Sequence, residues 1–254
     1  MSKPSRLENS FGYQQVDNQE RERRIRDVFN RVASRYDLMN DVMSFGIHRL
    51  WKHTFASMVT ERSRSMAKPQ AGQVLVDLAG GTGDIARQLA GDGHHTLLVD
   101  PSLPMMQAGH AAKPAANIRY LAATGENLPL RDNSVDVLTI AFGIRNMTRM
   151  ETALSEIVRV LKPGGYYFCL EFSRPHWLLK PFYDFHSFHI IPRLGAWISH
   201  QPAAYTYLVE SIRRFPDQQE LCRIMQQAGL EQVSYRNLSF GIACIHSGVK
   251  PGKA

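Results

Sequence analysis

The stretch Val-Leu-Val-Asp-Leu-Ala-Gly-Gly-Thr-Gly-Asp, residues 74–84, decides the fold of this chain. It begins with β-branched and apolar residues, which are typical of a strand buried on both faces of a sheet. Three glycines follow, and they allow positive φ and close approach of a ligand to the backbone. Apolar residues at helical spacing then begin with Ile85 and Leu89. The stretch predicts a strand, a turn, and a helix whose first N–H groups face a ligand.

The spacing of the glycines separates two nucleotide ligands. A dinucleotide-binding turn has the spacing G-x-G-x-x-G, with its acidic residue after the second strand. Here the glycines fall as G-G-x-G, and Asp77 already lies at the end of the first strand. A second acid, Asp100, ends the next apolar run and could accept hydrogen bonds from both hydroxyls of an adenosine ribose. The pattern favours S-adenosylmethionine over NAD and leaves an NAD-dependent oxidoreductase as an alternative.

Strands and helices alternate along the rest of the chain. Strands are expected at 96–99, 118–122, 135–141 and 166–171, helices at about 83–91, 102–112, 152–161 and 217–228, and a terminal antiparallel pair at 233–238 and 242–246. Pro163-Gly164-Gly165 is expected to end the helix before it in a sharp turn. This order predicts an α/β fold with a mostly parallel sheet, and ligands at the carboxyl ends of its strands.

Two further turns are expected beside the first one. Thr124, Gly125 and Glu126 follow the third strand, where side-chain oxygens and N–H groups can meet an adenine edge. Arg145 and Asn146 follow the fourth strand, on the side where a methyl acceptor would lie.

The N-terminal part divides into a mobile arm, residues 1–16, and a helical lid or substrate-binding extension, residues 17–70. A helix capped by Asp17 or Asn18 carries several arginines, which suit either a solvated face or contact with anionic lipid. Residues 36–51 mix methionines and aromatics with polar groups, which suits a lid over a ligand. His48 taken alone is more typical of a structural histidine than of a catalytic one.

The third region, residues 71–250, is the predicted methyltransferase domain, with an aromatic insert at 175–212. The composition of the insert suits an apolar wall of a binding site, an interfacial surface or a second hydrophobic core equally well. Its histidines, His186 and His189, have no metal-ligand spacing, so no metal is expected.

Composition sets broad limits. The net charge of +7 suits an RNA or membrane-surface partner as well as a solvated basic surface. Three dispersed cysteines indicate neither a zinc site nor a disulfide framework, and no run approaches ~18 apolar residues. We therefore expect a cytoplasmic protein that is neither secreted nor membrane-spanning, with peripheral contact at the inner membrane surface as a further expectation.

Residues 36–51 and 159–173 resemble the two signatures of one enzyme family, and residues 77–84 and 142–146 are similar to that family as well. The family that these four stretches resemble is that of the UbiE-type quinone C-methyltransferases. The resemblance covers about residues 11–246. It implies a class I, Rossmann-like methyltransferase fold with a seven-stranded sheet, and C-methylation of polyprenylated benzoquinols and naphthoquinols.

The resemblance also implies the site. It places contacts to S-adenosylmethionine at Thr82, Asp100 and Thr124-Gly125, and the full set of cofactor-binding candidates is Asp77, Gly81, Thr82, Gly83, Asp100, Thr124, Gly125, Glu126 and Ala141. Many relatives have Asn-Ala where this chain has Thr124-Gly125, and Ser where it has Ala141.

We expect Arg145 to stabilise a developing quinol oxyanion, and Asn146 to orient the ring or a water that takes its proton. His48 and Tyr36 are the alternative proton acceptors. Residues 39–51 and 177–197 would accommodate the polyprenyl tail. Candidate partners are the quinol, a membrane surface, other enzymes of quinone biosynthesis and a second copy of the chain, but not nucleic acid. A nucleic-acid methyltransferase and a non-catalytic binding subunit stay open as other classes.

Overall fold

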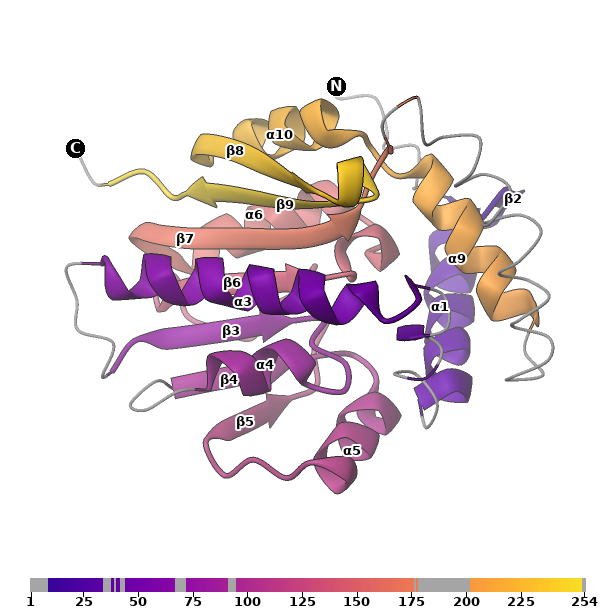
Figure 1. Ribbon diagram of the computed structural model, residues 1–254, viewed down its shortest axis with the longest axis horizontal. Coiled ribbons are helices and arrows are strands. Elements are labelled where there is room, and N and C mark those ends of the chain that lie inside the picture. Colours follow the sequence, from indigo (N-terminus) through magenta and orange to yellow (C-terminus); the bar gives the residue numbers. More distant parts are fainter. Residues whose placement is uncertain are drawn as a thin grey trace.

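The computed structural model describes residues 9–33, 38, 40–41, 44–66, 72–90, 95–175, 177 and 202–252. Among these residues, one seven-stranded sheet has the order β5-β4-β3-β6-β7-β9-β8 (Figure 1). Its strands are β3 (Val74–Leu78), β4 (His95–Val99), β5 (Ile118–Leu121), β6 (Val135–Ala141), β7 (Leu161–Phe172), β8 (Glu231–Leu238) and β9 (Ala243–Val249). Strands β3 to β7 are parallel, and β9 is antiparallel to both of its neighbours. The predicted fold class is confirmed.

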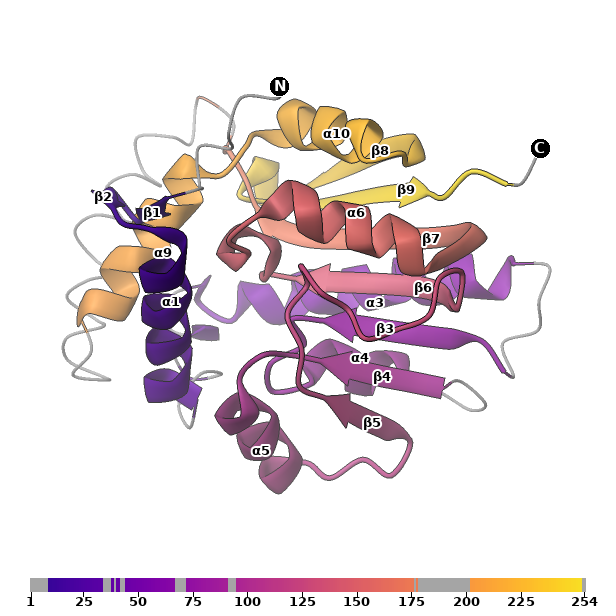
Figure 2. The ribbon, with the colours of Figure 1, turned by 180° about the vertical axis from the view of Figure 1, so that it is seen from behind.

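Helices cover both faces of the sheet (Figures 1 and 2). One face carries α3 (Ile47–Arg64), α4 (Asp84–Leu89) and α5 (Leu103–Ala112), and the other carries α6 (Met150–Val160) and α10 (Gln218–Gln227). Strand residues alternate between the faces. Leu75 packs with Phe55 of α3, whereas Val76 belongs to the core around Leu154 of α6.

The strand order places the site. β3 pairs with β4 on one side and with β6 on the other, so the chain reverses its direction of winding at β3. In such sheets, ligands bind in the crevice beyond the carboxyl ends of the strands at this reversal. Two helices, α1 (Asn18–Val32) and α9 (Pro202–Arg214), stand beyond the arrowheads of β3 and β6 in both views (Figures 1 and 2).

A short hairpin joins these two helices. It consists of β1 (Ser10–Phe11) and β2 (Gln14–Gln15), and the sequence did not predict it. The Phe11 ring stacks on Tyr207 of α9 with the centroids 4.4 Å apart. The Tyr13 N–H donates to the Glu210 carboxylate over 2.9 Å. Each of these contacts joins residues that lie far apart in sequence, which is why no local pattern revealed them.

The helix capped by Asp17 is confirmed as α1, where the Asp17 carboxylate accepts from the Glu20 N–H. Pro163-Gly164-Gly165 was expected as a turn between helix and strand, but β7 runs through it from Leu161. Gly164 has φ +78°, which lets the strand pass this point while its N–H donates to the Lys250 carbonyl.

Most of the aromatic insert lies outside the described residues, as do residues 36–37, 39 and 42–43 of the lid segment 36–51. Among the described helices, none has the length and the apolar character needed to cross a membrane.

Candidate active site

A pocket opens at the carboxyl ends of β3, β4, β5 and β6. It encloses about 980 Å³, part of which is open to solvent. Its walls come from the turns after these strands and from α1, and the lining includes Gly81, Asp100, Thr124, Gly125, Glu126, Ala141 and Asn146. Seven of the predicted site residues are thus brought together in one cavity.

The glycine-rich turn forms one wall of this pocket. Gly81 has φ +53°, a left-handed conformation that a residue with a side chain rarely adopts. Its N–H donates to Asp100 Oδ2 over 2.9 Å, which joins the turn after β3 to the end of β4. Helix α5 packs directly on the turn, because a Cβ at Gly109 would lie 2.0 Å from the Thr82 carbonyl oxygen. Gly109 is a required small residue that the sequence reading missed.

Asp100 presents a nearly buried carboxylate to the pocket. Its side chain accepts from the Gly81 and Ser102 N–H groups, and burial raises its pKa. A carboxylate has about four acceptor positions, so it can accept from a ligand hydroxyl as well.

Asp77 has a different place. It is 1% exposed, does not line the pocket, and accepts from the Ala86 N–H (3.0 Å) and the Thr139 hydroxyl (3.1 Å). Burial raises the pKa of Asp77 to about 7. Its contacts hold the start of α4 against β3 and β6, behind the turn.

The loops after β5 and β6 form the opposite wall. Glu126 Oε1 accepts from the Thr148 N–H (2.7 Å), which fixes the two loops to each other. Gly125 faces Met147, whose Cε would lie 2.7 Å from a Cβ at position 125. Gly125 and Met147 therefore fill this corner together.

Asn146 lines the pocket, whereas Arg145 lies behind it. The two belong to a short 3₁₀ turn, Ile144–Asn146. The Tyr207 hydroxyl donates to Asn146 Oδ1 over 2.9 Å, which orients the amide. Arg145 is 3% exposed and pairs with the buried Glu171 over 2.7 Å. The Arg145 guanidinium also donates to the Phe142 carbonyl (2.7 Å), so it is held away from the cavity.

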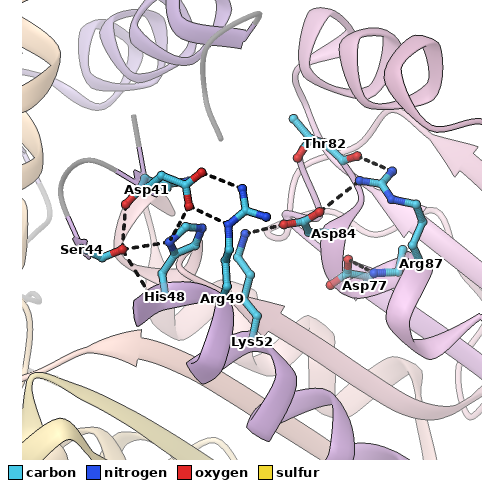
Figure 3. Close-up of polar contacts among 11 residues, drawn as sticks. Asp41, Ser44, His48, Arg49, Lys52, Asp77, Thr82, Asp84 and Arg87 are labelled. Atoms are coloured by element: carbon cyan, nitrogen blue, oxygen red, sulfur yellow. Dashed lines mark hydrogen bonds and ion pairs between the residues drawn. The ribbon is translucent and has the colours of Figure 1, made fainter. Parts of the chain in front are cut away.

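One of the two alternative proton acceptors, His48, does not line the pocket. His48 is on α3, 3% exposed, with Nδ1 2.8 Å from the Ser44 hydroxyl (Figure 3). Burial lowers its pKa to about 4, with a further contribution from the charge of Lys52. Tyr36 lies outside the described residues. Both roles stay predictions, and the low pKa makes His48 a weak base.

Comparison with known proteins defines the family. The model of the ubiE/COQ5 methyltransferase family matches residues 16–250. The chain belongs to this family. The ubiquinone/menaquinone biosynthesis C-methyltransferase UbiE of Rubrivivax gelatinosus is 57% identical over 254 residues, which cover 100% of this chain and 98% of that protein. The protein with the same name from Acidiphilium cryptum is 48% identical over 94% of this chain and 95% of its own length. The resemblance inferred from residues 36–51 and 159–173 is confirmed.

Solved structures with this fold are more distant. A chain of the complex between the Haloferax volcanii Trm112 methyltransferase activator and the putative methyltransferase has a TM-score of 0.60, 18% identity, and coverage of 91% of this chain and 99% of that chain. Haemonchus contortus phosphoethanolamine N-methyltransferase 2 in complex with S-adenosyl-L-methionine has a TM-score of 0.57 and 16% identity, and covers 77% of this chain and 52% of that one. They confirm the methyltransferase fold.

In this family member, α1, which lies within the predicted lid or substrate-binding extension 17–70, supplies a pocket wall. Ile25 and Phe29 line the cavity, as do Glu22 and Arg26. Arg21 is one of the arginines of this helix, for which a solvated face or contact with anionic lipid was expected, but it is 1% exposed. Its guanidinium donates to the Ser10 carbonyl (2.8 Å) and to the Arg145 carbonyl (3.1 Å). These carbonyl acceptors, which other segments of the chain supply, allow the charged guanidinium to be buried.

The pocket fits S-adenosylmethionine, which the family uses. A nearly buried carboxylate and a left-handed glycine face the same cavity, which suits the ribose and the amino-acid part of such a ligand. In the described part of the chain, no three His, Cys, Asp or Glu side chains gather as a metal site requires. The expectation of a metal-free enzyme stays a prediction.

Proposed function

We propose that this protein transfers a methyl group from S-adenosylmethionine to a ring carbon of a polyprenylated quinol in ubiquinone and menaquinone biosynthesis. The observation that carries the proposal is the 57% identity over the full chain to the Rubrivivax gelatinosus enzyme named for this reaction. The pocket also supports the proposal, because a single cavity is lined by Gly81 of the glycine-rich turn and by Asn146.

The roles of the residues follow from where they lie. S-adenosylmethionine, when bound, supplies an electrophilic methyl group whose transfer leaves a neutral thioether. We propose that the Asp100 carboxylate accepts from ribose hydroxyls, and that Gly81 contacts the amino-acid part, with Thr82, Gly83 and Asp77 supporting the turn from behind. Thr124, Gly125, Glu126 and Ala141 would surround the base and the methyl group.

On the acceptor side, a quinol ring carbon becomes nucleophilic when a neighbouring hydroxyl loses its proton, and the new C–C bond is followed by loss of the ring proton. We propose that Asn146 contacts this oxygen or a water on it, because its amide lines the pocket. Arg145 does not line the pocket, so its role would be to hold the loop and to supply a buried positive charge behind it. Such a fixed charge favours a developing anion.

Quinone profiling of a strain that lacks the protein tests this function. We expect the demethylated precursor to accumulate, and its ring to identify a benzoquinol, a naphthoquinol or both as substrate. An unchanged quinone profile would reject the proposal. Calorimetry with S-adenosylhomocysteine, NADH and RNA separates it from the oxidoreductase and nucleic-acid alternatives, and binding without turnover would indicate a non-catalytic subunit.

We further propose transient contact with a membrane surface, where the polyprenylated substrate resides. At the start of α3, Phe45 is 71% exposed and Leu50 is 64% exposed, and Ile47 between them is also exposed. Exposed large apolar side chains on a protein of net charge +7 suit an anionic lipid surface. Co-sedimentation with anionic vesicles at low salt tests this contact. Equal recovery with and without vesicles would reject it.

A further inference from the structure

A chain of polar contacts runs from α3 to the glycine-rich turn (Figure 3). It begins at Lys52 on α3, which is 6% exposed and donates from Nζ to Asp84 Oδ2 over 2.9 Å. Asp84 is the first residue of α4, and its other oxygen accepts from Arg87 over 3.2 Å. Arg87 Nη1 then donates to the Thr82 carbonyl over 2.8 Å. The contacts therefore end on the backbone of the turn itself.

Lys52 is an unusual residue to find here. Lysine is rarely so buried unless its ammonium group has a partner, because removing the charge from water is costly. Asp84 is that partner, and the interaction acts in both directions. Burial raises the pKa of Asp84, but the charges of Lys52 and Arg87 more than offset this effect, so that the pKa lies below its usual value. Asp84 thus remains a carboxylate that both cations can hold.

The surroundings of Lys52 exclude a simple surface pair. One turn earlier on α3 lies the buried His48, whose low pKa partly reflects the charge of Lys52. His48 Nδ1 is 3.7 Å from Asp41 Oδ1, and Asp41 pairs with Arg49 over 2.6 Å. Lys52 therefore lies between a neutral histidine and the turn, and Asp84 is the one acceptor recorded for its ammonium group among the described residues.

We propose that Lys52 is a positioning residue for methyl-donor binding. Through Asp84 and Arg87 it fixes the peptides of Thr82 and Gly83, and so the wall of the pocket that Gly81 forms. Lys52 does not line the pocket, so it acts on the ligand through the turn. The inference rests on the proposed function, because it takes this turn as the site of S-adenosylmethionine.

The test is Lys52→Gln, which removes the charge but keeps a polar side chain. We expect the Kd for S-adenosylhomocysteine, measured by calorimetry, to rise about tenfold, a typical size for the loss of one coupled contact. In the assay, KM for S-adenosylmethionine should rise, while KM for the quinol stays unchanged. Lys52→Arg should restore most of the affinity, because its guanidinium can reach the same carboxylate.

A matched control separates this role from general loss of an ion pair. Lys162 pairs with Asp136 over 2.6 Å at the amino end of β6, far from the pocket turns. Lys162→Gln should leave ligand affinity unchanged. Asp84→Asn should weaken binding as Lys52→Gln does, and the double variant should be no weaker than the worse single one, because both act through one contact.

Two readouts need no ligand. In Lys52→Gln apoprotein, amide exchange at residues 82–87 should be faster than in the wild type. The pKa of His48, followed by NMR, should rise from about 4 because a neighbouring positive charge is gone. A His48 pKa that rises but stays below the ordinary value of about 6.5 also shows that the variant is folded.

The outcomes are distinguishable. A wild type that binds no S-adenosylhomocysteine would reject the proposed function. If the wild type binds S-adenosylhomocysteine and the Kd of Lys52→Gln is within twofold of the wild-type value, only the role of Lys52 is rejected. Additive effects of Lys52→Gln and Asp84→Asn on the Kd would reject that role as well.

Discussion

The two halves of the pocket are built differently. The donor half, residues 80–84 and 100–102, is shaped mainly by the backbone, with the Gly81 N–H held by Asp100 nineteen residues away. The acceptor half, residues 142–148, is held by side chains from distant segments. Arg21 reaches the Arg145 carbonyl across 124 positions, and Tyr207 reaches Asn146 across 61. The hydrogen bond that shapes the glycine-rich turn spans 19 positions, whereas those that hold the acceptor half depend on the packing of α1 and α9.

The two halves of the pocket also differ in their charged groups. In the donor half, Asp77 and Asp100 are buried carboxyl groups that accept from backbone N–H groups. In the acceptor half, the buried Arg145 guanidinium pairs with the buried Glu171 carboxylate, and the buried Arg21 guanidinium donates to the Ser10 and Arg145 carbonyls. The donor half is thus suited to hydroxyl and amino groups, and the acceptor half to a developing anion. The variants Arg145→Ala, Asp77→Asn, Asp100→Asn and Tyr207→Phe each alter a group in one of the two halves.

The largest expected effect is that of Arg145→Ala. It leaves Glu171 buried without its cation, which costs about 3–5 kcal/mol in the free energy of unfolding. We also expect kcat to fall on the order of a hundredfold, the loss typical of one group that stabilises a developing oxyanion. Urea unfolding and steady-state kinetics measure the two effects separately.

The double variant Arg145→Ala/Glu171→Gln tests whether these effects are independent. It should recover much of the stability but not kcat. If kcat returns with stability, Arg145 has a structural role only. Arg223→Ala is the control, because the Arg223 side chain is 64% exposed in its pair with Glu220 and such pairs contribute about 1 kcal/mol or less.

The second effect concerns Asp77 and pH. In the folded protein, the pKa of the Asp77 carboxyl group is about 7, which lies above the ordinary value because burial disfavours the charged form. Below about pH 4 the carboxyl is protonated in both states, and the folded protein bears no penalty. As pH rises from about 4 to about 7, the unfolded chain releases the proton first, and stability falls by up to about 4 kcal/mol.

Asp77→Asn should remove this part of the pH dependence while keeping an acceptor for the Ala86 N–H. Urea unfolding at pH 5 and pH 8 measures it. The wild type should lose more stability between these values than the variant, and equal losses would contradict the assignment. Titrating groups that do not interact with Asp77 cancel in the comparison.

The third effect is on the ligand. Asp100→Asn replaces one oxygen that accepts from Gly81 or Ser102 with an amide donor, and it removes the charge facing the pocket. Hydrogen bonds to charged groups are worth about 1.5–3 kcal/mol, so the Kd for S-adenosylhomocysteine should rise roughly 10- to 100-fold. Asp132→Asn, at a 68% exposed side chain, is the control. Affinity within twofold of the wild type would show that Asp100 does not contact the ligand.

This contrast also explains what the sequence could predict. Residues 74–84 were interpreted correctly as strand, turn and helix, because local propensity and the glycines act within one short segment. Asp100 was placed correctly in the pocket, since strand ends of a parallel sheet share one edge. Asn146 was placed there for the same reason, and the family was identified from its signatures.

Long-range contacts account for the rest. Arg21 has the character of a solvated helix residue until its two carbonyl acceptors are known. Arg145 follows β6 as predicted, but its orientation toward Glu171 depends on β7, 26 positions later. The strand through Gly164 is imposed by pairing with Lys250, which overrides a local turn signal. Tertiary partners, and not propensities, determine these three features.

The smallest effect, and the sharpest test of the acceptor half, is Tyr207→Phe. It removes only the hydroxyl that donates to Asn146 Oδ1, and keeps the ring stacked on Phe11. The loss of one such hydrogen bond is worth about 1 kcal/mol, so kcat should fall about fivefold, while affinity for S-adenosylhomocysteine stays unchanged. The matched control is Tyr205→Phe on the same helix, because the buried Tyr205 hydroxyl has no hydrogen-bond partner among the described residues. If both variants lower kcat equally, packing of α9 matters and the Tyr207–Asn146 hydrogen bond does not.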